Sequence, residues 1–378
     1  MRISIITVCL NSRETIERTI QSVIGQQYDD LEYIMIDGGS TDGTVHIIEA
    51  YRDAISICIS EPDEGIYDAM NKGLQYASGD VVAFLNSDDW YVPEAEVFKR
   101  VREYFSGSDA DIVSGNIYTF ENGSRHIFPR NPITEENIFY DVVCPHPALF
   151  VKRELYGKWG GFDTSYKIAA DTKWIINACM KGADILCVED CFTYFGGGGI
   201  STTMRYEALQ EHYAASLSCA RNSCLKGIRK RIDDFFTVRL KAMKREKCLE
   251  SALQDHPEET RALFDCQRGY YIWGAGARGA ECLNILEKLD IPVIGVIDSN
   301  QELKTLGSYN VLKPEDADRR ISVCITPVRY EEEIKAHLRA WGMDAGQFFT
   351  YTDMLEKIVA AGAVYSGCVQ NGETLQKE

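Results

Sequence analysis

The stretch Phe84-Leu85-Asn86-Ser87-Asp88-Asp89 ends an apolar run over 81–85 with a cluster of polar side chains. A short apolar run bounded by polar residues predicts a buried strand. Two adjacent carboxylates directly after a strand suit a hard cation such as Mg²⁺ or Mn²⁺, which prefers oxygen ligands. An Asp pair at this place is also a common turn or helix cap, so the stretch alone leaves both interpretations open.

Three more predicted strands precede this one and alternate with helices. The strands are expected at 3–9, 31–36 and 55–60, with helices between them at 14–24 and, before the fourth strand, 69–77. This alternation predicts a mainly parallel sheet with helices on both faces. Polar clusters at 7–11, 37–42 and 86–89 each follow a strand directly. Because ligands bind at the carboxyl ends of parallel strands, we expect these clusters to meet at one crevice.

Composition excludes several classes of protein. The 378 residues carry a formal net charge of −17, which argues against nucleic-acid binding because such binding needs many Lys and Arg near phosphates. The 13 cysteines form no CxxC pair and His is scarce, so we expect reduced thiols rather than structural zinc. The N-terminus does not resemble a signal peptide, and no apolar run is long enough to span a bilayer. We therefore expect a cytoplasmic protein.

A second α/β pattern begins near residue 269. A predicted strand over 270–273 is followed by Gly274-Ala275-Gly276-Ala277-Arg278-Gly279, and a strand over 293–297 ends at Asp298. Gly274, Gly276, Gly279 and Asp298 match the fingerprint of a dinucleotide site, which on its own would indicate an NAD-dependent oxidoreductase. The unit is short and shows no second half. We expect a Rossmann-like appendage that either binds a nucleotide or only packs.

The segment between the two α/β patterns is helical and locally basic. Residues 226–247 hold nine Lys or Arg and three acids, within an acidic protein. An apolar side is formed by Ile228, Ile232, Phe235, Phe236, Leu240 and Met243. Such a helix either makes peripheral contact with an anionic membrane, at its inner face, or packs against its own domain. The pattern does not decide between the two.

Four motifs in the first part of the chain occur in a characteristic order. They are Thr7-Val8-Cys9-Leu10-Asn11, Ile36-Asp37-Gly38-Gly39-Ser40-Thr41-Asp42-Gly43, Glu61-Pro62-Asp63-Glu64-Gly65-Ile66-Tyr67-Asp68-Ala69-Met70-Asn71-Lys72-Gly73, and the stretch at 84–89. Together they resemble family 2 glycosyltransferases, which have the GT-A (type A) nucleotide-sugar fold. The resemblance covers about residues 1–201. It implies an inverting enzyme that moves a sugar from a nucleotide-diphosphate donor, by family default a UDP-sugar, to a hydroxyl of a glycan or lipid-linked acceptor in surface polysaccharide or glycolipid assembly.

The resemblance also implies roles for individual residues. The nucleobase is expected against Thr7 and its neighbours, with a hydrogen bond to Asp37. Asp88 corresponds to the last acid of the family's Asp-x-Asp motif and would ligate Mg²⁺ or Mn²⁺, with Asp89 assisting or holding the loop. The whole donor-binding set is expected to be Thr7, Val8, Asn11, Asp37, Asp63, Asn71, Lys72, Asn86 and Ser87.

Three positions depart from the family pattern. Asn86 replaces the first acid of Asp-x-Asp; its amide can accept a hydrogen bond from a ribose hydroxyl but carries no charge. Gly38 replaces the second acid of the base motif. Met70 stands where many members have an Arg that touches the donor. Lys72 either supplies that charge instead or is an exposed helix lysine.

A catalytic base is expected further along the chain. Trp159-Gly160-Gly161-Phe162-Asp163, followed by Asp171, resembles the family's Gly-Gly-Phe-Asp segment and its base. Asp171 would then take a proton from the acceptor, although an acid at a helix N-terminus is also common for structural reasons. His146 contacts the acceptor or the diphosphate, or is structural. The glycines from 196 to 199 resemble a closing loop over the donor.

These expectations define a domain plan. A GT-A catalytic domain with a mainly parallel α/β sheet spans 1–201, a basic helical segment spans 202–262, a Rossmann-like domain spans 263–356, and a loosely ordered tail spans 357–378. A catalytically degenerate nucleotide-sugar-binding module is the alternative function, and the presence of both Asp88 and Asp171 argues against it. The donor sugar, the acceptor, the pathway and the oligomeric state are not encoded in any motif.

Overall fold

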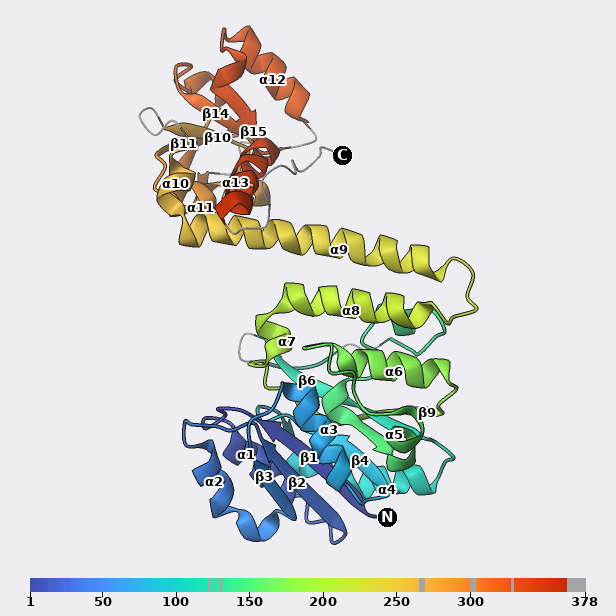
Figure 1. Cartoon of the computed structure of the whole chain (residues 1–378). Helices are drawn as coiled ribbons and strands as arrows, with labels where there is room; N and C mark the ends of the chain where they lie inside the picture. Colours follow the sequence, from blue (N-terminus) through green and yellow to red (C-terminus); the bar gives the residue numbers. More distant parts are fainter. Residues whose placement is uncertain (122–123, 129–130, 265–268, 300–303, 328–329, 366–378) are drawn as a thin grey trace. The chain divides into compact units, whose positions relative to one another are not determined.

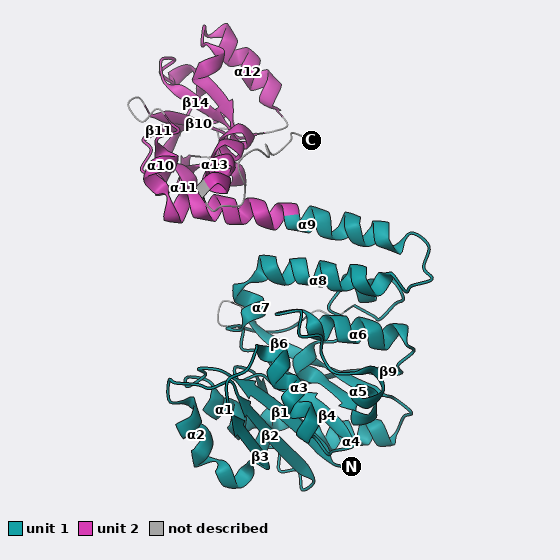
Figure 2. Cartoon of the chain, in the orientation of Figure 1, with its two compact units in different colours: residues 1–240 teal, residues 241–378 magenta. Residues whose placement is uncertain are grey.

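The structure is a computed structural model that describes residues 1–121, 124–128, 131–264, 269–299, 304–327 and 330–365. It divides into two compact units, residues 1–240 and 241–378 (Figures 1 and 2). The division falls within a single long helix, α9 (Ile228–Glu250).

The first half of the unit 1 sheet is parallel, as the sequence predicts. Its strands lie in the order β3-β2-β1-β4, with bounds β1 (Ile3–Cys9), β2 (Leu31–Asp37), β3 (Ile57–Ser60) and β4 (Val81–Phe84). The connecting helices are α1 (Ile16–Ile24), α2 (Thr44–Ala50) and α3 (Ile66–Tyr76). Every residue of β1 is buried, which explains its nearly continuous apolar sequence.

The second half of the same sheet is mixed. The order continues β4-β8-β6-β9-β5, and β7 pairs with β6. These strands are β5 (Trp90–Tyr91), β6 (Ile112–Glu121), β7 (Ser124–Ile127), β8 (Leu149–Lys152) and β9 (Ile185–Tyr194). Strand β8 is antiparallel to both β4 and β6, whereas β6 and β9 pair in parallel, so this part of the sheet departs from the predicted, mainly parallel layout. The helices here are α4 (Val97–Ser106), α5 (Arg153–Trp159) and α6 (Ala170–Met180).

An apolar core covers each face of the sheet. Alternate residues of β1 enter different cores: Ile6 and Val8 face one, and Ile3 and Ile5 face the other. The first core is closed by residues of α3, α5 and α6, and the second by residues of α1, α2 and α4. This layering leaves the carboxyl ends of β1, β2 and β4 at one edge.

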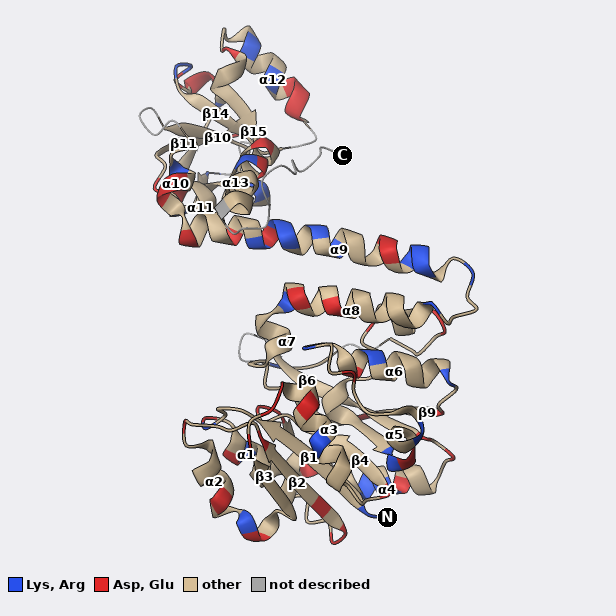
Figure 3. Ribbon diagram, in the orientation of Figure 1, with Lys and Arg blue, Asp and Glu red and all other residues tan. Residues whose placement is uncertain are grey.

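The helical segment packs its apolar side against its own unit. It comprises α7 (Ile200–Thr203), α8 (Arg205–Ala220) and α9. Ile232 and Phe236 of α9 are fully buried in the first core, and the Phe236 ring lies 5.3 Å from that of Tyr213 on α8. The interpretation in which this apolar side meets a membrane is therefore wrong. Lys and Arg recur along α9 (Figure 3). Their side chains are largely exposed.

Unit 2 contains a smaller sheet in the order β12-β13-β11-β10-β14-β15. Its strands are β10 (Tyr270–Trp273), β11 (Val293–Ile297), β12 (Thr305–Leu306), β13 (Tyr309–Leu312), β14 (Ser322–Ile325) and β15 (Phe348–Thr350). The helices are α10 (Pro257–Arg261), α11 (Ala277–Lys288), α12 (Glu331–Ala340) and α13 (Tyr351–Tyr365). Apart from the β12–β13 pair, the strand pairs are parallel, which is the predicted Rossmann-like layout.

The loose tail was expected over 357–378, but this boundary is placed too early in the chain. Helix α13 continues to Tyr365, with Ile358 and Val359 buried. Gly362 lies so close to the carbonyl oxygen of Cys248 on α9 that a Cβ atom there would collide with it. Packing against α9 thus keeps 357–365 helical, and residues 366–378 lie outside the described part of the chain. Within that described part, no helix is long and apolar enough to cross a membrane.

Phe236 gives a direct test of how α9 packs. Phe236→Ala should lower the free energy of unfolding by about 3–5 kcal/mol, because it removes a fully buried ring. Val238→Ala on the same helix should change it by less than about 0.5 kcal/mol, because Val238 is 68% exposed. Calorimetric unfolding of the full chain measures both. Equal melting behaviour of the two variants would contradict the packing of α9 on unit 1.

Candidate functional site

Asp37, at the end of β2, is a buried anchor for the loop that follows it. Its Oδ2 accepts hydrogen bonds from the backbone N–H groups of Gly39 (3.1 Å) and Ser40 (3.0 Å) and from the Ser60 hydroxyl (2.7 Å). Burial acts to raise the pKa of Asp37, but the hydrogen bonds from Ser40 and Ser60 outweigh it and lower the pKa. The carboxylate therefore fixes the shape of the loop while charged, and its contact with a nucleobase stays a prediction.

The end of β1 lies beside this loop. Thr7 and Val8 are buried, and the Thr7 hydroxyl lies 3.2 Å from that of Tyr33. Thr7 and Val8 are thus part of the buried sheet next to the crevice. Their contact with a nucleobase stays a prediction. Asn11 is exposed with a φ of 50°; its N–H donates to Ser40 Oγ (2.7 Å), and its Oδ1 accepts from Thr41 N–H (3.0 Å). Asn11 thereby ties the β1 loop to the β2 loop.

Asp63 explains why the base motif has a glycine at position 38. A Cβ atom on Gly38 would collide with the Asp63 carboxylate, so Asp63 fills the space that a side chain at 38 would need. Asp63 Oδ1 accepts a hydrogen bond from Gly65 N–H at 2.9 Å, which holds it in place. The Asp63 carboxylate therefore lies where a side chain at position 38 would stand.

Lys72 and Asn71 on α3 have structural partners. Lys72 Nζ lies 3.2 Å from Glu61 and 3.4 Å from Asp68, so its charge is already compensated. Whether Lys72 also takes the place of the family's arginine at the donor stays a prediction. The Asn71 side-chain amide donates to the Phe162 carbonyl (2.9 Å) and accepts from the Phe162 N–H (2.8 Å). Asn71 thus fastens the turn at 160–163 to α3.

The turn from Asn86 to Asp89 presents oxygen atoms without partners. Among the described residues, the buried Asn86 Oδ1, Asp88 Oδ2 and Asp89 Oδ2 accept no hydrogen bond. Burial raises the pKa of Asp89 well above its usual range, and the neighbouring Asp88 charge raises it further. Burial also raises the pKa of Asp88. Buried, uncompensated carboxylate oxygens are costly, and a divalent cation with oxygen ligands would satisfy them.

This donor set is incomplete on its own. No cluster of three or more His, Cys, Asp or Glu side chains suited to a metal occurs in the part of the chain that the structure describes. Two carboxylates and one amide fit a Mg²⁺ or Mn²⁺ site in which phosphates and water complete the coordination, as is usual for Mg²⁺. The residues present therefore fit the predicted metal.

The turn is held on two sides by residues that sequence reasoning missed. From α1, the Thr19 hydroxyl lies 2.9 Å from the Ser87 carbonyl oxygen and 2.7 Å from that of Asp89, and Arg18 donates to the Asp88 carbonyl (3.1 Å). The Ser87 hydroxyl is engaged with Ser12 at 2.7 Å. A Thr and an Arg in an amphipathic helix give no signal of this role in the sequence.

The glycine loop at 196–199 closes the other side of the turn. Gly196 N–H donates to Asp89 Oδ1 (2.9 Å), and a Cβ atom on Gly196 would collide with the Asp88 backbone carbonyl. A Cβ on Gly199 would lie 3.4 Å from Asp88 Oδ2. The predicted closing loop therefore contacts the predicted metal-ligating residues directly, and glycine is required at 196 because nothing larger fits.

Asp171 lies in the first turn of α6 among aromatic side chains. The Tyr67 hydroxyl is 2.8 Å from Asp171 Oδ1 and 2.6 Å from the carbonyl oxygen of Ile168. His146 stacks on Phe84 with ring centroids 5.5 Å apart. Burial lowers the pKa of His146, while the charge of Asp171 acts to raise it, so the imidazole is neutral near pH 7. Tyr67, which sequence reasoning missed, positions the predicted base.

The glycine turn of unit 2 satisfies part of the dinucleotide fingerprint. Gly274 has a φ of 113°, and a Cβ atom on Gly279 would collide with the Gly274 carbonyl, so both glycines are needed for the tight turn. Gly276 has open space around it. Asp298 Oδ2 accepts a hydrogen bond from Ala275 N–H at 2.8 Å, so this carboxylate is engaged with the turn itself. A second nucleotide site here stays a prediction.

Comparisons with known proteins agree with this geometry. The sequence model for glycosyl transferase family 2 matches residues 4–163. An uncharacterized glycosyltransferase of Mycobacterium tuberculosis is 34% identical over 202 residues, which cover 52% of this chain and 76% of the relative. A PGL/p-HBAD biosynthesis glycosyltransferase of Mycobacterium bovis is 31% identical over 187 residues, covering 46% of this chain and 67% of the relative.

Solved structures show the same fold. S. aureus TarS 1-349 in complex with UDP superposes with a TM-score of 0.52 at 21% identity, covering 70% of this chain and 79% of that chain. TarS 1-349 in complex with UDP-GlcNAc gives 0.50 at 19% identity, covering 69% and 78%. Fold and site thus define a nucleotide-sugar-dependent glycosyltransferase of the GT-A class. The chain belongs to glycosyltransferase family 2.

The role of Tyr67 can be tested through the rate of transfer. Tyr67→Phe removes a hydrogen-bond donor from the Asp171 carboxylate. The kcat should therefore fall by about fivefold, which corresponds to one lost hydrogen bond. Tyr76→Phe, exposed on the same helix, is the control. An unchanged kcat in Tyr67→Phe would show that Tyr67 does not act on the base.

The burial of Asp89 leads to a second prediction, which concerns the affinity of the protein for Mn²⁺. Because burial raises the pKa of Asp89, its carboxyl keeps its proton at low pH and must lose it before a cation binds. The affinity for Mn²⁺ should therefore rise as the pH increases from about 5 to about 8. Calorimetric titration should show weaker binding and a flatter pH dependence in Asp89→Asn, whose amide oxygen still accepts from Gly196. Exposed Asp53→Asn is the control; the same pH dependence in Asp89→Asn would refute the assignment.

Proposed function

We propose that this enzyme transfers a sugar from a nucleotide-diphosphate donor, a UDP-sugar, to a hydroxyl of a glycan or lipid-linked acceptor. The observation that carries the proposal is the set of unpartnered buried oxygens at Asn86, Asp88 and Asp89, at the edge of the sheet where the polar clusters meet. The UDP and UDP-GlcNAc complexes of TarS support the choice of donor class. The relative named for PGL/p-HBAD biosynthesis supports an acceptor in glycolipid or polysaccharide assembly.

The donor would be held at the carboxyl edge of the sheet. Asp63 and the loop anchored by Asp37 would border the nucleobase and ribose, and the Asn86 amide would accept a hydrogen bond from a ribose hydroxyl. Asp88 and Asp89 would hold Mg²⁺ or Mn²⁺. When bound, such a cation neutralises charge that develops on the leaving diphosphate.

The acceptor would be activated by Asp171. Its carboxylate, oriented by Tyr67, takes the proton of the acceptor hydroxyl while that oxygen attacks the anomeric carbon. A single displacement inverts the anomeric centre. His146, neutral and stacked on Phe84, shapes the apolar wall near the base and does not compete for the proton. The loop at 196–199 limits the access of water to the diphosphate.

The decisive experiment combines donor turnover and donor binding. The purified chain is incubated with a panel of nucleotide sugars, with and without Mn²⁺ or Mg²⁺, and the release of free nucleoside diphosphate is measured. One donor should be hydrolysed only with metal; Asp88→Ala should abolish this, and Asp171→Asn should reduce transfer to acceptor by at least about 10³-fold while donor binding persists. Asp53→Asn is the matched control, and thermal shift in the same samples reports binding.

Other outcomes would favour the alternatives. Metal-dependent stabilisation by a nucleotide sugar without turnover of any donor, even with acceptors present, would identify a catalytically degenerate binding module. Stabilisation by NAD alone would identify an oxidoreductase that uses the glycine turn of unit 2. A cytoplasmic location, with the exposed basic residues of α9 at the inner face of an anionic membrane, stays a prediction.

A further inference from the structure

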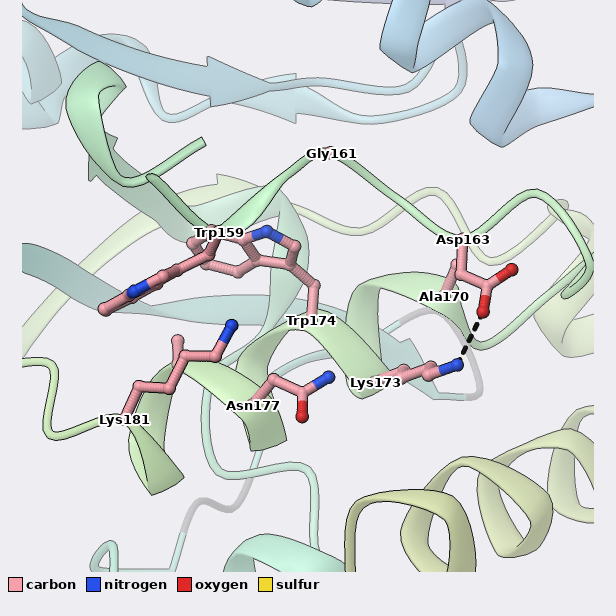
Figure 4. A pocket seen from close by; sticks show the side chains of 9 residues that line it. Trp159, Gly161, Asp163, Ala170, Lys173, Trp174, Asn177 and Lys181 are labelled. Atoms are coloured by element: carbon pink, nitrogen blue, oxygen red, sulfur yellow. Dashed lines mark hydrogen bonds and ion pairs between the residues drawn. The ribbon is translucent and has the colours of Figure 1, made fainter. Parts of the chain in front are cut away.

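A further pocket lies between α5 and α6 (Figure 4), and none of the residues that line it belongs to the turn at 86–89. Two indole rings border it, those of Trp159 and Trp174, with centroids 6.2 Å apart. Trp174 Nε1 donates a hydrogen bond to the Gly160 carbonyl at 2.9 Å, which fixes that ring, while Trp159 is only half-buried. A preformed aromatic wall with a few polar groups around it is the usual composition of a small-ligand site.

The polar groups come from one face of α6. Lys173, Asn177 and Lys181 follow one another at intervals of four residues, so they line the same side of the helix. Lys173 is paired with Asp163 at 2.5 Å. In the described part of the chain, neither the Asn177 amide nor the Lys181 ammonium has a hydrogen-bond or ion-pair partner. The Lys181 ammonium points toward the two indole rings (Figure 4).

A second cation lies at the same ring. Lys181 Nζ and Lys158 Nζ each lie 5.5 Å from the centroid of the Trp159 ring, and the described residues provide no carboxylate partner for either. Both ammonium groups are exposed and lie near the same half-buried indole, so an anion bound at this ring would be attracted by both charges. In a protein with a net charge of −17, such a local excess of positive charge favours an anionic ligand over a neutral one.

The position of the pocket relates it to the acceptor. Asp171 and Lys173 are two residues apart on α6, so they lie on opposite faces of a helix about 10 Å wide. The turn at 160–163 links the two sides: Phe162 packs against Tyr67 near Asp171, with centroids 5.5 Å apart, while Gly161 lines the pocket. An oligosaccharide with its reacting hydroxyl at Asp171 could cross this turn and reach the pocket within a few sugar units.

We propose that the pocket between α5 and α6 is an acceptor subsite for an anionic sugar unit, carrying a carboxylate or a phosphate. The sugar ring stacks on Trp159, the Asn177 amide meets a hydroxyl, and Lys158 and Lys181 neutralise the charge. This inference rests on the proposed function for its link to an acceptor, but the binding of anionic sugars by the pocket can be measured on its own.

The test uses two matched pairs of probes with the full chain. Trigalacturonate is compared with its methyl ester, and glucose 6-phosphate with glucose, by calorimetry or ligand-observed NMR. The wild type should bind at least one charged probe about tenfold more tightly than its neutral partner, the value expected for one charge-assisted contact. Lys181→Gln should remove this preference, and Trp159→Leu should weaken both members of the pair. Lys230→Gln, an exposed lysine of α9, is the control.

Each outcome of this experiment either supports or overturns the proposed subsite. A preference in only one pair identifies the anion as carboxylate or phosphate. Equal affinity for charged and neutral probes, no binding of either charged probe, or an unchanged preference in Lys181→Gln would overturn the proposal. Metal-dependent donor hydrolysis is measured in the same samples and should be unaltered in Lys181→Gln. If the wild type hydrolyses no donor yet binds charged probes through Lys181, the pocket stands as an anionic-sugar site and the proposed function fails.

Discussion

The active site is organised around a buried carboxylate that its own fold leaves partly unsatisfied. Asp89 is fully buried, and among the described residues its carboxylate accepts a single hydrogen bond, from Gly196 N–H to Oδ1. Burying a charge with so little compensation is unfavourable, so the turn can persist only if its backbone is fixed independently. Thr19 of α1 provides this fixation from one side and the glycine loop after β9 from the other. Three distant parts of the chain must therefore come together before the turn from Asn86 to Asp89 has its shape.

Asp37 and Asp89 lie at the ends of neighbouring parts of the sheet but have opposite electrostatic surroundings. Asp37 receives enough hydrogen bonds to overcome its burial, so its pKa is lowered, while Asp89 receives one and its pKa is raised. The first is a completed structural unit that needs nothing further to remain charged. The second would gain stability from a cation, in line with the proposed metal site. This contrast separates an anchoring carboxylate from a ligand-binding one without reference to any relative.

The sequence was sufficient for the parts of the fold that depend on local pattern. The strands β1, β2 and β4 and the polar clusters after them follow from apolar runs that end at turn residues. The mixed half of the sheet was not predicted, because the place of the antiparallel strand β8 between β4 and β6 depends on long-range pairing. Tyr67, Thr19 and Arg18 resemble ordinary helix residues, so their functions became visible only when their hydrogen bonds could be traced. The closeness of the Asp63 carboxylate to Gly38 was hidden for the same reason.

Helix α9 belongs to the cores of both units, and this shared membership has a consequence for synthesis on the ribosome. Phe236 completes the core of the first unit, while Cys248 and Ala252, at the end of α9 and just beyond it, are buried with residues of the second. A nascent chain cannot close its catalytic core until this helix has begun to emerge from the exit tunnel. The helix then carries unburied apolar groups until α13, more than 100 residues further along the chain, has been synthesised and covers them. The order of folding is thus set by this shared helix: the core of the catalytic unit can close first, and the core of the second unit closes later.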